Sequence, residues 1–451
     1  MARTSRVSRR SARPVMTGQR LWLKAKRLIP GGSQLLSKRA EMFLPDQWPA
    51  YYSKAKGCEI WDIVGRKLVD MSIMGVGTCP LGYADSDVNA AVKKRIDAGN
   101  MCTLNCPEEV ELSELLCKLH PWAKMVRLGR AAGEALAIAV RIARAHTGRE
   151  IVAFCGYHGW HDWYLSANLA DDKALDGHLL PGLEPAGVPR GLKGTALPFK
   201  FNDADALEKI LTENKGKVAA IMMEPTRSAP PAPGFLERVR RLADEHGAVL
   251  IFDEVTIGFR LCLGGAHLVY GVMPDMAVFG KAISNGYAMA AVIGREEVMQ
   301  SAQRTFISST YWTEGVGSAA ALATLRKMKR VNLPAYLKKV GTRLQAGLAE
   351  CAKRHGLKLN VMGHPPEPIL GFDYGDKSQA VYTLYVQEML ARGFLASRVI
   401  YMSLAHKDKH IAAFLRAADE VFPILAEAAQ ENDVEKRLRG PIAHTGFRRL
   451  N

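Results

Sequence analysis

The sequence lacks the features that mark several specialised classes of protein. Its 451 residues include 8 cysteines and no Cys-x-x-Cys pair, so no disulfide scaffold is predicted. No apolar run approaches the roughly 18 residues needed to cross a bilayer, and no hydrophobic signal segment follows the start of the chain. With 48% hydrophobic and 24% charged residues, the chain is expected to form a globular protein with a large core in a reducing compartment.

Acidic residues are missing from the first 39 positions, which supply +11 of the formal charge of +16. The basic residues there are Arg3, Arg6, Arg9, Arg10, Arg13, Arg20, Lys24, Lys26, Arg27, Lys38 and Arg39. We predict that residues 1–20 form a basic disordered leader rather than a nucleic-acid-binding element. The predicted location is the cytoplasm, or an organellar matrix if this Arg- and Ser-rich leader is a presequence.

Short apolar runs alternate with helical patterns between about residues 129 and 309, which predicts an α/β fold with a parallel sheet covered by helices. Continuous apolar runs of this kind are typical of strands buried on both faces. The predicted strands are Ile151–Cys155, Val218–Met223, Ala248–Phe252, Met276–Phe279 and Ala290–Ile293. The predicted helices between them are Glu134–His146 and Gly234–His246.

Both ends of the chain are predicted to build a second, smaller domain. A hairpin over residues 56–70 turns at Val64-Gly65, and amphipathic helices are predicted over residues 333–355 and 411–430. We therefore expect a large domain over residues 76–325. The smaller α+β domain combines residues 21–75 with residues 326–440, and residues 441–451 form a tail.

Three polar residues follow successive predicted strands: Glu224, Asp253 and Lys281. In open α/β sheets, ligands bind outside the carboxyl ends of the strands, so these side chains should converge on one crevice. A lysine amine that loses its proton can form a Schiff base with an aldehyde, and a carboxylate can keep a pyridine nitrogen protonated. From these residue types alone, a simple ion pair is an equally good interpretation.

The residues around Asp253 and Lys281 favour a Schiff-base site over a simple ion pair. Residues 251–260 read IFDEVTIGFR, and they are followed by LGGA at 263–266, MPDM at 273–276 and FGKAI at 279–283. This run resembles the class III aminotransferases of fold type I, most closely the glutamate-1-semialdehyde 2,1-aminomutase branch. The resemblance extends over about residues 28–428 and implies a large domain with a mostly parallel seven-stranded sheet, together with the cofactor pyridoxal 5'-phosphate.

The resemblance also implies roles for individual residues. Lys281 would form the Schiff base with the cofactor, and Asp253 would pair with the pyridine nitrogen. Tyr157 would stack on one face of the ring with His158 beside it, and Val255 would pack against the other face. Lys281 would also act as the general base and acid of the amino transfer.

The phosphate site departs from the family pattern, because RAAGEA stands at residues 130–135 in place of Asn-Ser-Gly-Thr-Glu-Ala. We expect the backbone amides of Ala132 and Gly133 to hold the phosphate at a helix N-terminus, with added charge from Arg130. Glu224 is expected among the cofactor contacts. Thr310 matches the threonine that reaches the cofactor of the neighbouring subunit in this family, which implies a homodimer with shared active sites.

Three further departures concern the substrate side. Lys38 and Arg39 stand where the family has a carboxylate-binding arginine, and lysine lacks the planar fork of arginine. The segments at residues 226–230 and 284–288 also differ from the aminomutase branch. We therefore predict an aminotransferase that moves an amino group from an amino acid, L-glutamate, to a keto or aldehyde acceptor such as a sugar.

Two alternatives stay open at this point. One is the aminomutase reaction, an intramolecular amino exchange. The other is a non-catalytic or nucleic-acid-binding protein that uses the basic leader, although neither a nucleic acid nor a membrane is an expected partner. His158 and His161 have a spacing that could suit a metal, but a loop beside the stacking Tyr157 explains them better, so no metal is predicted.

Overall fold

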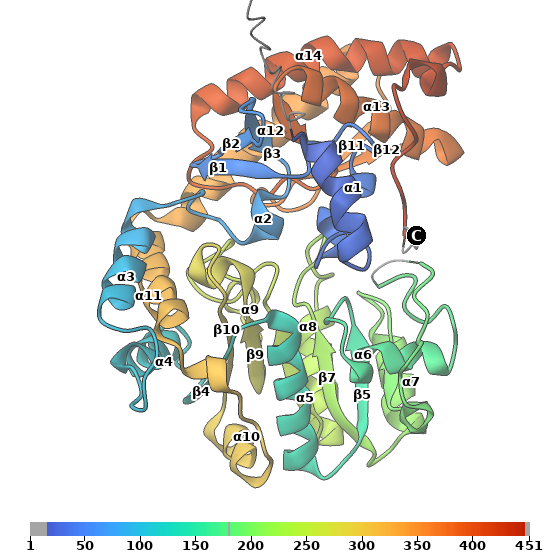
Figure 1. Cartoon of the computed structure of the whole chain (residues 1–451). Helices are drawn as coiled ribbons and strands as arrows, with labels where there is room; N and C mark the ends of the chain where they lie inside the picture. Colours follow the sequence, from blue (N-terminus) through green and yellow to red (C-terminus); the bar gives the residue numbers. More distant parts are fainter. Residues whose placement is uncertain (1–15, 179–180, 447–451) are drawn as a thin grey trace, which may run out of the picture.

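The structure, a computed structural model, describes residues 16–178 and 181–446 and divides into two lobes (Figure 1). The lower lobe in Figure 1 contains a sheet of seven strands. In spatial order they are β4 (Met125–Gly129), β10 (Ala290–Gly294), β9 (Met276–Phe279), β8 (Val249–Asp253), β7 (Val218–Met223), β5 (Ile151–Cys155) and β6 (Ala196–Pro198). The pairs β6–β5, β5–β7, β7–β8 and β8–β9 are parallel, whereas β10 runs antiparallel to both β9 and β4. The sheet is therefore mostly parallel, as predicted.

Helices cover both faces of this sheet, which explains why its strands are continuously apolar. On one face, α5 (Ala132–Thr147) packs its alanine-rich surface against alternate side chains of the central strands. On the other face lie α7 (Ala204–Glu213) and α8 (Phe235–His246). Gly148 and Gly247 end α5 and α8 with φ of 67° and 61°, the left-handed conformation that favours glycine at a helix C-terminus.

A group of helices flanks the β4 and β10 side of the sheet. They are α3 (Ser86–Asp97), α4 (Pro107–Leu119) and α11 (Gly315–Arg330), and α11 packs along both of the others (Figure 1). Short helices occupy connections: α2 (Met74–Gly77), α6 (Asp162–Leu165), α9 (His267–Tyr270) and α10 (Glu296–Met299).

The upper lobe is built from both ends of the chain. A four-stranded sheet has the order β1 (Tyr52–Lys56), β2 (Glu59–Asp62), β3 (Lys67–Met71) and β13 (Phe394–Ala396). The strand β13 pairs with β3 in parallel, so residues from both ends of the chain share one sheet. A second hairpin joins β11 (Leu359–Met362) to β12 (Ile369–Phe372). The helices of this lobe are α1 (Gly18–Leu28), α12 (Leu333–Arg354), α13 (Ser378–Ala391) and α14 (Asp408–Gln430).

The 3-10 helices are single turns within connections. They span Leu36–Lys38, Ala40–Met42, Ser166–Leu169, Arg190–Leu192, Lys281–Ser284, Gln300–Arg304, Thr310–Thr313, Gly375–Lys377 and Val434–Arg437. No helix in the described part of the chain is both long and apolar enough to cross a membrane.

The predicted disordered leader is wrong at its C-terminal end. The hydroxyl of Thr17 accepts a hydrogen bond from the Arg20 N–H, so α1 begins at Gly18 inside the predicted leader. Gly18 is buried, and a Cβ added to it would lie 1.8 Å from the Pro49 carbonyl oxygen. The remainder of the leader, residues 1–15, lies outside the described residues.

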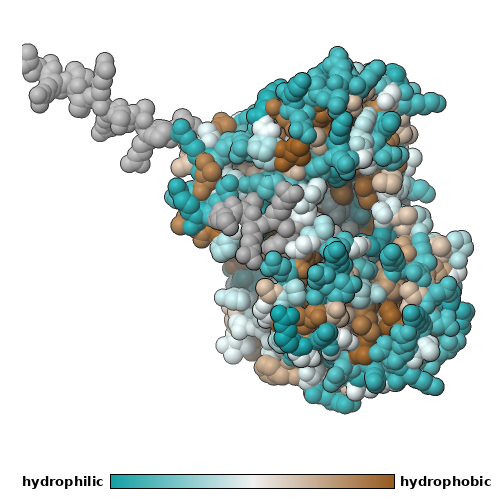
Figure 2. All heavy atoms as spheres, turned by 90° about the vertical axis from the view of Figure 1, so that its right-hand side faces the viewer, coloured by the Kyte–Doolittle hydropathy of each residue, from teal (hydrophilic) through white to brown (hydrophobic). Residues whose placement is uncertain are grey.

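Figure 2 shows a face on which hydrophilic side chains cover most of both lobes and hydrophobic ones form small scattered patches. Part of the tail predicted after residue 440 is attached to the upper lobe. The Ala443 N–H donates to the Thr383 hydroxyl, and the His444 N–H donates to the Glu41 carbonyl.

Candidate active site

Three predicted site residues lie at the carboxyl ends of neighbouring parallel strands of the large sheet. Glu224 comes directly after β7, Asp253 is the last residue of β8, and Lys281 comes two residues after β9. The charges of Asp253 and Lys281 both act on the Glu224 carboxyl group, so the three side chains share one electrostatic environment. The structure therefore places them at a single edge of the sheet.

The Lys281 amine has one hydrogen-bond acceptor that the sequence analysis missed. Its Nζ donates to Oγ1 of Thr256 at 2.9 Å. Burial lowers the pKa of this amine from its usual value, and a buried amine is more readily available in its unprotonated, nucleophilic form. Lys281 also has a φ of 40°, a conformation that is uncommon for residues other than glycine and that occurs preferentially at functional sites.

The Asp253 carboxylate is held on both oxygens. Oδ2 lies 2.8 Å from His158 Nδ1, and Oδ1 accepts the Val255 N–H at 3.0 Å. His158 is in turn fixed by its Nε2, which lies 3.1 Å from the Cys155 carbonyl oxygen. Because His158 and Asp253 are both buried, this carboxylate has a defined position and little freedom to turn toward solvent.

Glu224 has the most unusual carboxyl group of the site. Burial raises its pKa to about 7, and the neighbouring charge of Asp253 acts in the same direction. Arg227 opposes this shift through an ion pair in which its Nε lies 3.1 Å from Glu224 Oε2. A carboxyl group that titrates near neutral pH can hold or release a proton under ordinary conditions.

The N-terminus of α5 offers the predicted anion site. The Glu134 carboxylate accepts hydrogen bonds from the N–H groups of Arg130 and Ala131, the two residues that precede the helix. These hydrogen bonds do not involve the N–H groups of the first turn. The N–H groups of Ala132 and Gly133 belong to that first turn, where no partner exists within the helix. They point out of the positive end of a helix of 16 residues, which suits a phosphate group.

Glycines bring three segments into close contact at this helix end. A Cβ added to Gly159 would lie 3.0 Å from Gly133 Cα, and a Cβ added to Gly280 would lie 3.0 Å from Ala132 Cβ and 3.5 Å from Val255. Val255 therefore lies beside the segment that leads to Lys281. The amine, the fixed carboxylate and the anion site together fit the predicted cofactor, pyridoxal phosphate.

Tyr157 lies beside these groups but is 43% exposed, and its ring meets that of Tyr164 edge-on at 6.0 Å. Its predicted stacking on the cofactor stays a prediction. The role expected for Thr310 also stays a prediction. This residue is exposed and begins a 3-10 helix over Thr310–Thr313.

The additional charge expected from Arg130 is a wrong prediction. Its guanidinium forms an ion pair with Glu314 at 2.8 Å and donates to the carbonyl oxygens of Trp312 and Glu314, also at 2.8 Å. Arg130 thus ties the start of α5 to the segment before α11 instead of adding charge to the phosphate site.

A second pair of charged residues lies near Lys281 and was also missed. Nε of the fully buried Arg260 lies 2.8 Å from Oε1 of Glu367, which comes from the other lobe. Arg260 and Thr256 both belong to the motif at residues 251–260, so the motif contained a signal for them. Glu367 lies more than 100 positions further along the chain, and no sequence pattern connected it with the site.

A cavity of about 310 Å³ lies next to the segment between β3 and α3, and Lys38 and Gly286 both line it. Its aromatic lining consists of Phe43, Trp48, Tyr51, Tyr52 and Tyr83. The Arg39 side chain lies against Gly31 instead, because a Cβ added to Gly31 would lie 2.1 Å from the Arg39 guanidinium. Of the two basic residues predicted on the substrate side, Lys38 is therefore the one in the cavity wall.

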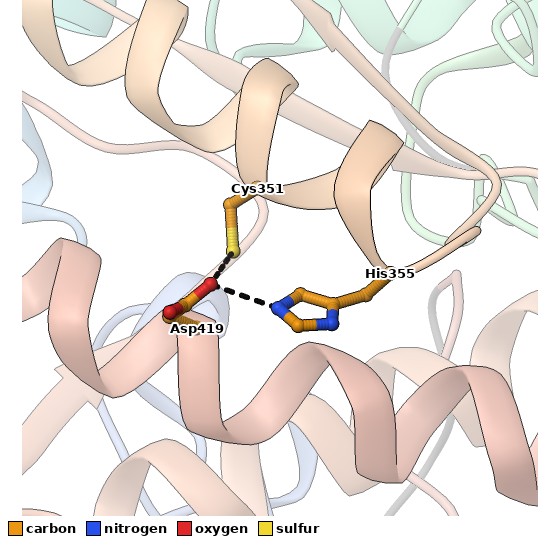
Figure 3. A group of neighbouring side chains, drawn as sticks. All are labelled: Cys351, His355 and Asp419. Carbon is orange, nitrogen blue, oxygen red and sulfur yellow. Dashed lines mark hydrogen bonds and ion pairs between the residues drawn. The ribbon is translucent and has the colours of Figure 1, made fainter.

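Among the described residues, the histidines near the site do not form a group with other metal ligands. His158 is engaged with Asp253 and Cys155, as described above, and His161 stacks on Trp160 at 4.5 Å. A separate trio, Cys351, His355 and Asp419, converges between α12 and α14 (Figure 3). The same Asp419 oxygen that accepts from His355 at 2.8 Å also accepts from Arg354 at 2.8 Å, so a cation already occupies this position. The absence of a metal stays a prediction.

Known proteins resemble this chain over most of its length. The family described as aminotransferase class-III matches residues 44–413. The chain is 31% identical over 412 residues to a 3-aminobutyryl-CoA aminotransferase of Cloacimonas acidaminovorans (strain Evry), covering 89% of this chain and 95% of that protein. It is 32% identical over 426 residues to a glutamate-1-semialdehyde 2,1-aminomutase of Syntrophobacter fumaroxidans (strain DSM 10017 / MPOB), covering 89% and 96%.

A similar solved structure is the PLP internal aldimine form of the FumI protein of Sphingopyxis sp. MTA144. It aligns with a TM-score of 0.82 at 26% identity and covers 91% of this chain and 97% of that one.

Proposed function

Since the chain belongs to the class III aminotransferase family, we propose that it transfers an amino group from L-glutamate to a keto or aldehyde acceptor. The observation that carries this proposal is the partly buried Lys281 amine, which lies at the same sheet edge as the fixed carboxylate of Asp253. Family membership and the fold type I architecture make the protein a pyridoxal-phosphate enzyme.

The residues of this chain would hold the cofactor at three points. The Ala132 and Gly133 amides would bind the phosphate, Asp253 would pair with the ring nitrogen, and Val255 would pack on the ring. Pyridoxal phosphate supplies an aldehyde that exchanges amines and a ring that accepts electrons from the substrate carbon. The role of this protein is to orient the ring, to exclude water and to move protons.

Lys281 is the residue that would move the proton. In its unprotonated form, Nζ can take a proton from the substrate carbon that bears the amino group, and the protonated form can then return it. The Thr256 hydroxyl at 2.9 Å fixes the direction of the amine in both states, because an oxygen can accept from either form. His158 keeps the Asp253 carboxylate in place, so it acts as a positioning residue.

The acceptor that we propose is a keto or aldehydo sugar. The cavity beside Lys38 supports this choice, because its aromatic walls offer faces for stacking and its volume of about 310 Å³ accommodates a small ligand. The relative from Cloacimonas is named for 3-aminobutyryl-CoA, so a β-amino thioester belongs in the same panel of test substrates.

The second candidate function is the aminomutase reaction, because a relative with 32% identity carries that name. It needs no external donor, and conversion of glutamate 1-semialdehyde by the protein alone would identify it. The replacement of the carboxylate-binding arginine by Lys38 argues against this reaction, since lysine binds a carboxylate through one point rather than two.

We also propose a homodimer in which Thr310 of each subunit reaches the active site of the other. The exposed hydrophobic residues around Thr310 support this proposal, because Phe306 is 83% exposed and Tyr311 is 71% exposed in the single chain. The proposed location is the cytoplasm, with an organellar matrix as the alternative if the basic leader is removed as a presequence.

The visible spectrum of the purified protein before and after addition of L-glutamate tests the proposed function. A yellow absorption band that bleaches with L-glutamate establishes the cofactor, a working Lys281 and the donor half-reaction together. A band that ignores L-glutamate contradicts the proposed donor and directs the test to other amines and to glutamate 1-semialdehyde.

A protein that shows no band even with added pyridoxal phosphate would contradict the enzymatic proposal. The basic leader would then direct attention to nucleic acid. Retention on DNA or RNA that depends on salt and is lost when residues 1–20 are deleted would support that non-catalytic function.

A further inference from the structure

The start of α5 offers a phosphate group no side-chain donor. Alanine occupies positions 131 and 132, Gly133 stands where the family pattern has threonine, and Arg130 is engaged with Glu314. Only backbone amides of this segment are therefore left to bind the phosphate. Because a phosphate group has several strong acceptor oxygens, a further donor from another segment is worth seeking.

His161, from the loop after β5, lies beside Gly133. A Cβ added to Gly133 would lie 3.5 Å from His161 Nδ1 and 3.6 Å from Gly159 Cα. These are ordinary van der Waals distances, so a side chain would fit at position 133 and lack of space does not explain the glycine. The imidazole nitrogen thus lies next to the position from which the threonine of the family pattern would project.

The Nδ1 atom of His161 is buried and has no hydrogen-bond partner within residues 16–178 and 181–446. A buried polar atom that makes no hydrogen bond destabilises a protein, so such atoms are uncommon. An acceptor that belongs to a bound group would satisfy this nitrogen. The orphaned atom beside Gly133 therefore points to a ligand with an acceptor oxygen at the start of α5.

The position of the His161 ring is fixed by its surroundings. The ring stacks on Trp160 with 4.5 Å between the ring centroids and 27° between the planes. The His161 carbonyl oxygen accepts from the Tyr164 N–H at 2.9 Å, at the start of α6. The contact between Gly159 and Gly133 holds the same loop against α5. Because the ring is already in place, a hydrogen bond from Nδ1 costs little conformational entropy on binding.

Burial favours the neutral form of the ring, because it lowers the pKa of His161, while the charges of Glu134 and Asp162 oppose this shift. A neutral imidazole carries one N–H group, and the acceptor that is present decides which nitrogen holds it. A phosphate oxygen beside Nδ1 would place the proton on Nδ1. The negative charge of the phosphate would also strengthen the hydrogen bond.

We propose that His161 is a cofactor-binding residue, whose Nδ1–H donates to the phosphate of pyridoxal phosphate in place of the hydroxyl groups missing from residues 130–135. This inference rests on the cofactor of the proposed function, and it is independent of the amino donor and the acceptor. It adds a side chain to the backbone amides of Ala132 and Gly133. The phosphate would thus be bound by two segments, the start of α5 and the loop after β5.

The variant His161→Ala tests this inference in binding experiments that need no turnover. The apoprotein is titrated with pyridoxal phosphate and, separately, with pyridoxal, which lacks the phosphate group. Loss of a hydrogen bond to a charged group should weaken binding of pyridoxal phosphate by roughly 10- to 100-fold. Affinity for pyridoxal should stay the same, because the variant removes no contact with it. Inorganic phosphate, measured as a competitor of pyridoxal phosphate, should lose affinity as the cofactor does.

Two rescue variants separate this role from a structural one. In the double variant Gly133→Thr/His161→Ala, the threonine hydroxyl can supply the missing hydrogen bond, so affinity for pyridoxal phosphate should recover by roughly tenfold. His161→Asn places an amide N–H close to the position of Nδ1, so it should bind the cofactor more tightly than His161→Ala. If His161→Ala does not fold, His161→Phe takes its place, since it keeps a ring on Trp160, has no donor and should show the same loss.

His146→Ala is the matched control, because His146 lies near the other end of α5, where its ring hydrogen-bonds with the Ser301 hydroxyl at 3.2 Å. It should change the affinity for neither pyridoxal phosphate nor inorganic phosphate. Unchanged binding of pyridoxal phosphate by His161→Ala would overturn the inference and leave the enzymatic proposal intact. An equal loss of affinity for pyridoxal and pyridoxal phosphate would also overturn it, since it would indicate a structural role. A natural protein that binds no pyridoxal phosphate would overturn both the inference and the proposed function.

Discussion

The contact between Gly159 and the start of α5 gives the sharpest prediction about cofactor binding. In Gly159→Ala the new Cβ would lie 3.0 Å from Gly133 Cα, well inside the 3.5–4.0 Å at which carbon atoms normally meet. Gly159 also has a φ of 101°, so alanine there is strained whatever the space. His158, which precedes Gly159, is expected to position Asp253, and Gly133 itself is expected to bind the phosphate.

The magnitude follows from two separate costs. The backbone conformation alone costs a residue with a Cβ roughly 1–2 kcal/mol. Forcing an additional carbon into a packed contact costs about 1–3 kcal/mol more. The free protein can relieve this contact by a shift of the start of α5, and phosphate binding must reverse that shift. Since 1.4 kcal/mol is about a factor of ten in an equilibrium constant, the steric part should weaken cofactor binding by roughly 10- to 100-fold.

Gly99→Ala is the matched control for the conformational cost. Gly99 has a φ of 96° and nothing within 4 Å of an added Cβ. Titration of the apoprotein with pyridoxal phosphate, followed by absorbance, gives the Kd of each variant, and urea unfolding gives the stability. A Gly159→Ala protein that binds the cofactor as tightly as the natural protein does, and that is as stable in urea as Gly99→Ala, would refute both the contact and the phosphate site.

Three further predictions concern the charged groups of the site. Lys281→Ala should keep the fold and lose amino transfer by roughly 10²- to 10⁴-fold in a coupled assay with L-glutamate, and substantial transfer by this variant would remove Lys281 from the mechanism. Asp253→Asn should still bind the cofactor but react far more slowly in the same assay, and equal rates would contradict its role. Burial raises the pKa of Glu224 from 4.5 to about 7, so the unfolded chain releases this proton first and the unfolding free energy of the apoprotein should fall as pH rises from about 4.5 to 7. In urea unfolding across this range, the natural protein should lose about 3 kcal/mol of unfolding free energy, and Glu224→Gln should not. Identical pH profiles for the two proteins would contradict this prediction.

The elements of the large sheet could be predicted from local pattern because each strand is covered on both faces. Val218–Met223 and Met276–Phe279 are continuously apolar for that reason, and their observed bounds match the predicted ones. The polar residues that follow these strands marked the edge of the sheet where Glu224, Asp253 and Lys281 now lie together. Parallel strands end at the same edge, so the order of residues in the chain was sufficient for this step.

The sequence by itself thus determined the fold type, the family and the residues at the carboxyl ends of the strands. Only the tertiary structure decided how charged side chains are paired. It directed Arg130 to Glu314 rather than to the phosphate site, and it placed Glu367 of one lobe beside Arg260 of the other. The physical reason is that strand and helix patterns repeat over a few residues, whereas an ion pair depends on where two distant segments meet, and neither partner carries a mark of the other in its local sequence.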